Sequence, residues 1–185
     1  MRHLPNLICI ARIALIWPIV SALYSHDYWI ALALFLIAAV SDGLDGYLAK
    51  RFGWQSELGK FLDPSADKLL LTAVFVSATW FGLVPQWLTA TAIARDFMIS
   101  AGALVFTLWF GPLNGRPTIV SKINTAAQLI YLSCVMALAG FGFPPQEMVD
   151  ALAVITVCLT VLSGIDYIYS FARRAWYMPP PARSA

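Results

Sequence analysis

The sequence predicts an all-α membrane protein, a bundle of six transmembrane helices with both termini in the cytoplasm. Of its 185 residues, 60% are hydrophobic and only 12% are charged, whereas soluble domains are about 25% charged. The mean hydropathy is +0.74. The apolar residues also gather into six runs, each close to the roughly 20 residues that cross the hydrocarbon core of a bilayer.

The six runs follow one another through short connections. They cover residues 4–23, 28–49, 62–82, 86–110, 120–141 and 149–171. Glycine, proline and small polar residues between them are typical of turns. Pro5, Asn6 and Arg12 interrupt the first run, which argues against a cleaved signal peptide. We expect one membrane domain over residues 1–178 and a disordered, proline-rich tail over residues 179–185.

Lysine and arginine predict the orientation in the membrane. They fall on one side of the six runs, at Arg2, Lys50, Arg51, Lys60, Lys68, Arg116, Lys122, Arg173, Arg174 and Arg183. The opposite connections carry only His26, Asp27, Glu147 and Asp150. The positive-inside rule then places both termini in the cytoplasm, as for a protein of the bacterial inner membrane. The net charge of +2 and the lack of basic runs interleaved with aromatics give no case for nucleic acid binding.

Four carboxylates stand inside or beside the second and third apolar runs. Ionisable side chains at membrane depth cost roughly 2.5 to 3.5 kcal/mol each, so such a group needs a compensating cation, water or substrate. In a helix, one stripe at i, i+3, i+4 and i+7 would hold Asp42, Asp45, Gly46 and Ala49. A second stripe at i, i+4 and i+8 would hold Gly59, Asp63 and Asp67.

The two stripes are expected to face each other across a short polar turn that includes Lys50, Arg51 and Glu57. Carboxylate oxygens suit a hard divalent cation such as Mg²⁺ or Mn²⁺, and the small residues leave room for a bulky group beside it. Asp63 precedes a proline, so it is also a candidate N-cap of a helix that starts there. Such a helix would point backbone N–H groups at an anionic substrate.

The pattern Asp-x-x-Asp-Gly-x-x-Ala from residue 42, followed by Gly-x-x-x-Asp-x-x-x-Asp from residue 59, resembles the signature of the CDP-alcohol phosphatidyltransferase family. The resemblance extends over nearly the whole chain. One position departs from it, because the family has arginine directly after the alanine and this chain has Lys50 and then Arg51. Only arginine offers a planar fork to phosphate, so either Lys50 acts as a point charge or Arg51 takes that role.

The resemblance implies that an acceptor hydroxyl attacks the lipid-side phosphorus of CDP-diacylglycerol and expels CMP. It implies a homodimer in the lipid bilayer and Mg²⁺ or Mn²⁺ held by Asp42, Asp45, Asp63 and Asp67. Asp67 would also be the base that accepts the hydroxyl proton. The nucleotide would lie beside Gly46, Ala49, Lys50 and Gly59.

Further charges extend the expected site. Arg12 and Arg95 lie in the middle of apolar runs, so each should face the bundle interior and a carboxylate or phosphate. For Arg95, a purely structural pairing with Asp96 or Asp166 is the alternative. The candidate acceptor or phosphate-binding residues are Arg95, Arg116 and Lys122.

The acceptor alcohol is open between two choices. Residues 117–128 resemble the matching segment of eukaryotic-type cardiolipin synthases, whose acceptor is phosphatidylglycerol. Phosphatidylglycerol phosphate synthases, whose acceptor is glycerol 3-phosphate, usually have a second lysine where Asn124 stands. A dianionic phosphate favours that extra cation, so the sequence favours phosphatidylglycerol.

An ion or proton transporter is the alternative from a different class, since transporters also bury carboxylates in small helix bundles. Here the acids crowd toward one face of the membrane, and the later half of the chain has no comparable group. Release of CMP from CDP-diacylglycerol would separate the enzyme from a transporter.

Overall fold

A computed structural model describes residues 4–52, 57–110 and 118–177, and within them the side chains of residues 11–41, 68–105, 118–171 and 173. The described residues form helices and no β-strand. The helices are α1 (Leu4–Tyr24), α2 (Tyr28–Phe52), α3 (Glu57–Trp80), α4 (Gln86–Phe110), α5 (Ile119–Phe141) and α6 (Gln146–Tyr177). The all-α prediction is therefore confirmed, and each helix corresponds to one of the six predicted runs, although α3 ends at Trp80, two residues before the predicted end of its run.

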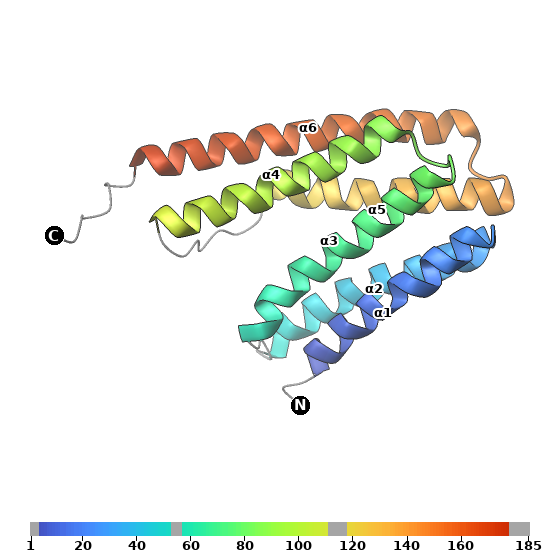
Figure 1. The fold of residues 1–185 in the computed structure, drawn as a ribbon, viewed down its shortest axis with the longest axis horizontal. Helices are drawn as coiled ribbons and strands as arrows, with labels where there is room; N and C mark the ends of the chain where they lie inside the picture. Colours follow the sequence, from blue (N-terminus) through green and yellow to red (C-terminus); the bar gives the residue numbers. More distant parts are fainter. Residues whose placement is uncertain (1–3, 53–56, 111–117, 178–185) are drawn as a thin grey trace.

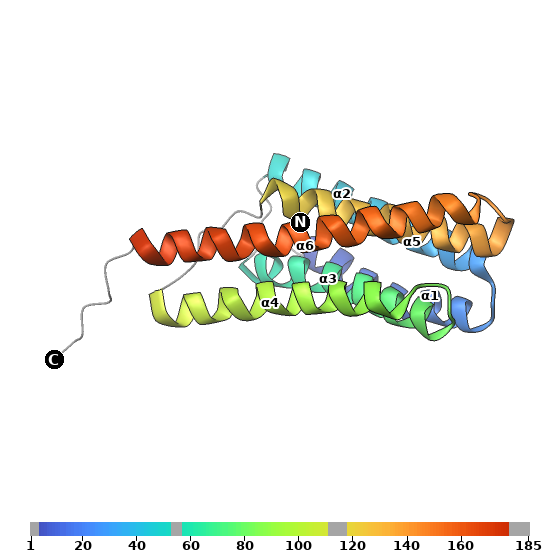
Figure 2. The same ribbon diagram turned by 90° about the horizontal axis from the view of Figure 1, so that it is seen from above.

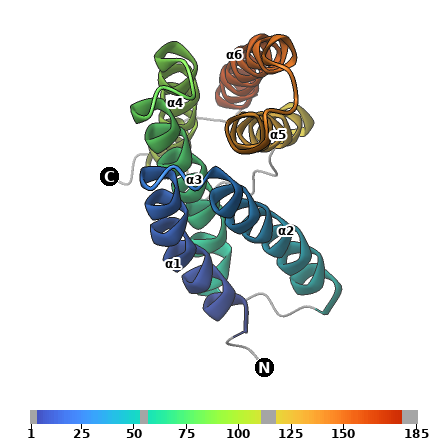
Figure 3. The same cartoon turned by 90° about the vertical axis from the view of Figure 1, so that its right-hand side faces the viewer.

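The helices form two layers of three (Figures 1 and 2). One layer holds α1, α3 and α4, and the other holds α2, α5 and α6. Seen end-on, α4 and α6 lie at one side of the bundle, α1 and α2 at the other, and α3 and α5 between them (Figure 3). The packing agrees with this view, since α1 contacts α2 and α3, and α6 contacts α4 and α5.

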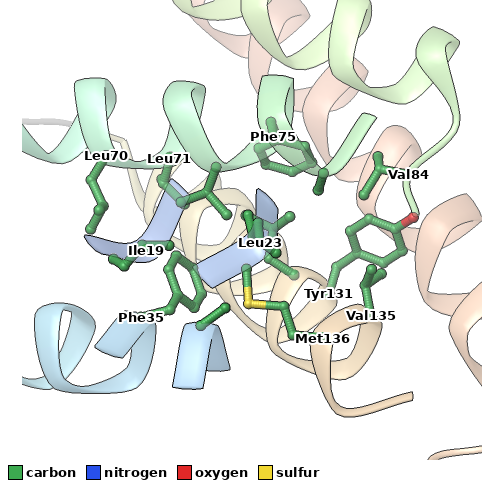
Figure 4. Close-up of a cluster of buried hydrophobic side chains, with 14 of the residues drawn as sticks. Ile19, Leu23, Phe35, Leu70, Leu71, Phe75, Val84, Tyr131, Val135 and Met136 are labelled. Carbon is green, nitrogen blue, oxygen red and sulfur yellow. The ribbon is translucent and has the colours of Figure 1, made fainter. Parts of the chain in front are cut away.

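The main apolar core lies among α1, α2, α3 and α5 (Figure 4). Phe35, Phe75 and Tyr131 are its largest members, each at most 2% exposed. The rings of Phe75 and Tyr131 stack with their centroids 6.4 Å apart. This core holds α3 against α1 and α5, and so fixes the helix that carries Asp63 and Asp67.

The described turns gather at one end of the bundle, which is the right-hand end of Figure 1. They connect α1 to α2, α3 to α4, and α5 to α6, at three of the places where turn residues predicted them. Gly82 and Gly142 have positive φ angles of 73° and 70° there, a conformation that glycine adopts without a steric penalty. Trp29, Trp80 and Trp87 are exposed near this end, as expected for side chains at a membrane interface.

Three of the helices carry described stretches long and apolar enough to cross a membrane: Gln86–Val105, Ile119–Phe141 and Gln146–Phe171. The described parts of α1, α2 and α3 contain shorter apolar stretches, Ala11–Tyr24, Tyr28–Ser41 and Lys68–Trp80. The composition is that of an integral membrane protein. Six spans and cytoplasmic termini stay predictions, and the expected tail at 179–185 lies outside the described residues.

The start of α3 differs from the prediction. The helix begins at Glu57, so Asp63 and Pro64 lie inside it, and the interpretation of Asp63 as an N-cap is wrong. The residues before the proline include leucine, glutamate and lysine, which are good helix formers. The helix therefore starts upstream of the predicted position. Likewise, α2 continues through Lys50 and Arg51 to Phe52, so the connection between α2 and α3 is shorter than the predicted polar turn.

Candidate active site

The predicted carboxylates lie on two consecutive helices. Asp42 and Asp45 belong to the C-terminal half of α2, with Gly46 and Ala49 in the same stripe, and Asp63 and Asp67 belong to the N-terminal half of α3 with Gly59. Helical backbone at both places confirms the register on which the two stripes depend. Their side chains lie outside the described set, so their facing arrangement stays a prediction.

Lys68 connects this part of α3 to α4. It follows Asp67 directly in the chain, and its Nζ donates a hydrogen bond of 2.8 Å to Ser100 Oγ on α4. Asp96 attracts the ammonium and Arg95 repels it. The turn of α3 that carries Asp67 is thereby attached to the helix that carries Arg95.

Arg95 is buried at the junction of α4, α5 and α6, with 7% of its surface exposed. Its Nη1 donates to Asp96 Oδ1 at 2.6 Å. Its Nη2 donates to Ser121 Oγ of α5 at 2.7 Å and to Ser163 Oγ of α6 at 2.5 Å. The inward orientation predicted for Arg95 is confirmed, and so is its pairing with Asp96. The two serine partners were not predicted, because an isolated serine in an apolar helix carries no pattern that marks it.

A second buried polar contact lies one turn further along α5. Thr160 Oγ1 of α6 donates to Asn124 Oδ1 at 2.8 Å, and both side chains are at most 2% exposed. Asn124 therefore faces α6 inside the bundle. A lysine at this position would bury its ammonium between the two helices, so the buried position does not support the expectation that such a lysine contacts a dianionic phosphate acceptor.

The other predicted cations lie in different surroundings. Lys122 is exposed in the first turn of α5, next to Ser121. Arg12 is only 4% exposed, which confirms its predicted inward orientation. Arg116 lies outside the described residues. Binding of an acceptor or phosphate by Arg95, Arg116 and Lys122 stays a prediction.

The donor chemistry of the site fits a divalent metal. Asp42 and Asp45 lie one turn apart on α2, and Asp63 and Asp67 lie one turn apart on α3, so each helix offers two carboxylates from one stripe. Hard cations such as Mg²⁺ prefer such oxygens. The side chains that the structure describes contain no other group of three or more histidine, cysteine or acidic residues suited to a metal.

A family model for CDP-alcohol phosphatidyltransferases matches residues 2–165 of the chain. The chain belongs to the CDP-alcohol phosphatidyltransferase family. The matched residues include both carboxylate stripes and the contacting residues Lys68 and Ser100. They also include Arg95 with its partners Asp96, Ser121 and Ser163. The resemblance inferred from the sequence signature is confirmed.

Relatives that carry two different enzyme names resemble the chain to the same degree. Cardiolipin synthase (CMP-forming) of Homo sapiens is 32% identical over 92% of this chain and 62% of its own length. CDP-diacylglycerol–glycerol-3-phosphate 3-phosphatidyltransferase of Bacillus subtilis is 33% identical over 90% of this chain and 94% of its own length. The enzyme of the latter kind from Salmonella choleraesuis is 31% identical over 90% of this chain. The chain spans about three fifths of the length of the human relative, and these identities do not separate the two kinds.

Proposed function

We propose that the protein transfers a phosphatidyl group from CDP-diacylglycerol to phosphatidylglycerol, which forms cardiolipin and releases CMP. The observation that carries this proposal is the family signature on two consecutive helices, with its carboxylates in one stripe on α2 and one on α3. The acceptor is inferred from residues 117–128, which resemble the matching segment of eukaryotic-type cardiolipin synthases. Glycerol 3-phosphate, giving phosphatidylglycerol phosphate, is the second candidate because relatives of that kind are equally similar.

The chemistry is a phosphoryl transfer in which positioning and charge stabilisation contribute most. The acceptor oxygen forms a bond to the lipid-side phosphorus of the donor, and the bond from that phosphorus to CMP breaks. Asp67 accepts the proton of the acceptor hydroxyl. Gly46, Ala49 and Gly59 leave space for the nucleotide, with Lys50 or Arg51 beside its phosphates. Arg95, Arg116 and Lys122 bind the acceptor.

Asp42, Asp45 and Asp63 would hold Mg²⁺ or Mn²⁺, with Asp67 as a further contact. The metal supplies positive charge that neutralises the diphosphate when bound. Activity should therefore disappear on chelation and return when Mg²⁺ or Mn²⁺ is added back. Full activity after exhaustive chelation would contradict the metal assignment.

The deciding experiment offers the purified protein CDP-diacylglycerol together with either phosphatidylglycerol or glycerol 3-phosphate, and identifies the lipid product. We expect cardiolipin from phosphatidylglycerol and little product from glycerol 3-phosphate. Efficient phosphatidylglycerol phosphate synthesis would favour the second candidate. Absence of CMP release with any acceptor would contradict the enzymatic proposal and favour a different class, such as a transporter.

We also propose that the protein is a homodimer of the bacterial inner membrane with its active site open to the cytoplasm. The orientation is supported by the basic residues of the described helices, which stand away from the helix ends that the described turns join. The small and aromatic residues on α3 and α4 support self-association, since close helix packing in membranes uses small residues.

A further inference from the structure

A groove of about 500 Å³ runs between α4 and α6, the two helices at one side of the bundle in Figure 3. Its α6 wall is formed by Val161, Ile165 and Ile168, each about half exposed or more. Its α4 wall includes Ala90 and Ala94, whose small side chains leave the space open. The volume falls within the range of about 300 to 1,000 Å³ that is typical of ligand pockets.

The groove lies on two helices whose composition suits contact with lipid. Both of its helices carry stretches long and apolar enough to span a membrane, over Gln86–Val105 and Gln146–Phe171. Gly164 adds no side chain to the lining, and a Cβ there would lie 3.2 Å from Cε of Met98, which also lines the groove. An apolar groove on such a surface is matched in polarity by a lipid tail.

The groove also has a charged element, because Arg95 contributes to its lining. The Nη atoms of Arg95 donate to Asp96, Ser121 and Ser163, but its buried Nε has no hydrogen-bond partner among the described residues. Arginine is suited to phosphate because its N–H donors form a planar fork. Apolar walls beside a buried arginine match an anionic phospholipid better than a small polar molecule.

The place of the groove in the bundle favours the acceptor lipid over the donor. The expected metal and nucleotide residues lie on α2 and α3, whereas α4 and α6, whose residues line the groove, lie at the opposite side of the bundle from α1 and α2 (Figure 3). In phosphoryl transfer, the attacking and leaving oxygens lie roughly in line on opposite sides of the phosphorus. With CMP leaving on the α2 side, the acceptor approaches from the α4 side. The contact between Lys68 and Ser100 joins these two regions.

We propose that the groove between α4 and α6 holds an acyl chain of the acceptor phospholipid, whose phosphate is bound near Arg95. This inference rests on the proposed function, in which the acceptor is phosphatidylglycerol. It identifies Ala90 and Ala94 as residues that set the preference for a long-chain lipid acceptor.

The test fills the groove with the double variant Ala90→Leu/Ala94→Leu. Both alanines are exposed, so the larger side chains can be accommodated without disturbing the core. Purified enzyme receives CDP-diacylglycerol and either dioleoyl or dihexanoyl phosphatidylglycerol. We expect the KM for the dioleoyl acceptor to rise by roughly tenfold or more, in the range found for changes of methylene content in hydrophobic pockets. The KM for the dihexanoyl acceptor and that for CDP-diacylglycerol should change by less than about twofold.

Ala33→Leu is the matched control, because it places the same side chain on an exposed position of α2 away from the groove. It should leave all three KM values unchanged. An equal effect of the double variant on both acceptors, an effect on CDP-diacylglycerol, or no effect on any KM would overturn the proposal. Oxidative cross-linking of Ala94→Cys between copies in native membranes would also overturn it, by placing a second copy in the groove.

The lipid products of the wild-type protein distinguish a failure of this proposal from a failure of the proposed function on which it rests. If it forms phosphatidylglycerol phosphate and no cardiolipin, the proposed acceptor is wrong, and the groove inference fails with it. If it forms cardiolipin with the same KM in wild-type and groove-filled enzyme, only the groove inference fails.

Discussion

The Nζ atom of Lys68 on α3 donates a hydrogen bond of 2.8 Å to Ser100 Oγ on α4. Lys68 directly follows Asp67, the predicted base, and Asp96 on α4 attracts its ammonium. A charged contact between two helices restrains their relative rotation and translation. The Lys68–Ser100 bond is therefore in a position to set where Asp67 lies relative to the acceptor side of the bundle.

Lys68→Met should lower kcat by about tenfold, the change that corresponds to about 1.4 kcal/mol, with little change in the KM for CDP-diacylglycerol. Lys68→Arg should retain most of the activity, because it keeps a cationic donor of similar reach. Ser100→Ala should lower kcat less, because Asp96 still attracts the ammonium. In a double-mutant cycle, Ser100→Ala should add nothing to Lys68→Met. Additive effects on kcat would show that the hydrogen bond has no part in positioning Asp67.

Asp67→Asn should lower turnover by at least about 10²-fold, because the amide keeps the size of the side chain but cannot accept the hydroxyl proton. CMP release from CDP-diacylglycerol by purified protein measures this change. The control is Asp150→Asn at the opposite end of the bundle, where the carboxylate is exposed and accepts a hydrogen bond from Gln146. It should leave turnover unchanged. Near-normal turnover of folded Asp67→Asn protein would remove Asp67 from the mechanism.

The helix positions could be predicted from the sequence because each apolar run is bounded by glycine, proline or charge. The start of α3 could not be predicted, because Pro64 suggested a helix start whereas the helix formers before it extend the helix by several residues. Burial of Arg95 followed from its place in an apolar run. Its partners Ser121 and Ser163 could not be predicted, because they come from two later helices and no spacing in the sequence relates them to Arg95. Tertiary packing decided these contacts.

Cysteines introduced at Gln86 and Gln146 should react with a membrane-impermeant thiol reagent added to intact cells. These exposed residues begin α4 and α6 at the end of the bundle that carries the described turns. A cysteine at Ser56, in the connection between α2 and α3, should react only after the membrane is opened. The asymmetry of basic residues is the reason for this expectation. External labelling of Ser56→Cys would contradict a cytoplasmic active site.

Variants of Arg95 test whether its partly buried ion pair with Asp96 serves the structure or the substrate. Arg95→Met leaves the Asp96 carboxylate, which is 17% exposed, without its cation. This variant should lose about 1 kcal/mol of stability, the low end of the cost of an unsatisfied buried group, because Asp96 is only partly buried, and most of its activity. In Arg95→Met/Asp96→Asn, removal of the orphaned charge should restore much of the stability.

The activity of this double variant is the decisive measurement. If Arg95 binds the acceptor phosphate, kcat/KM for phosphatidylglycerol should stay at least about tenfold below wild type, which corresponds to about 1.4 kcal/mol, even though the protein is stable. Asp96→Asn alone should keep most of that kcat/KM, because it leaves the arginine in place with its bonds to Ser121 and Ser163. Thermal unfolding in detergent and cardiolipin formation, measured on the same preparations, distinguish the two roles. Recovery of both stability and activity in the double variant would make Arg95 a structural residue and move the acceptor site to the exposed Lys122.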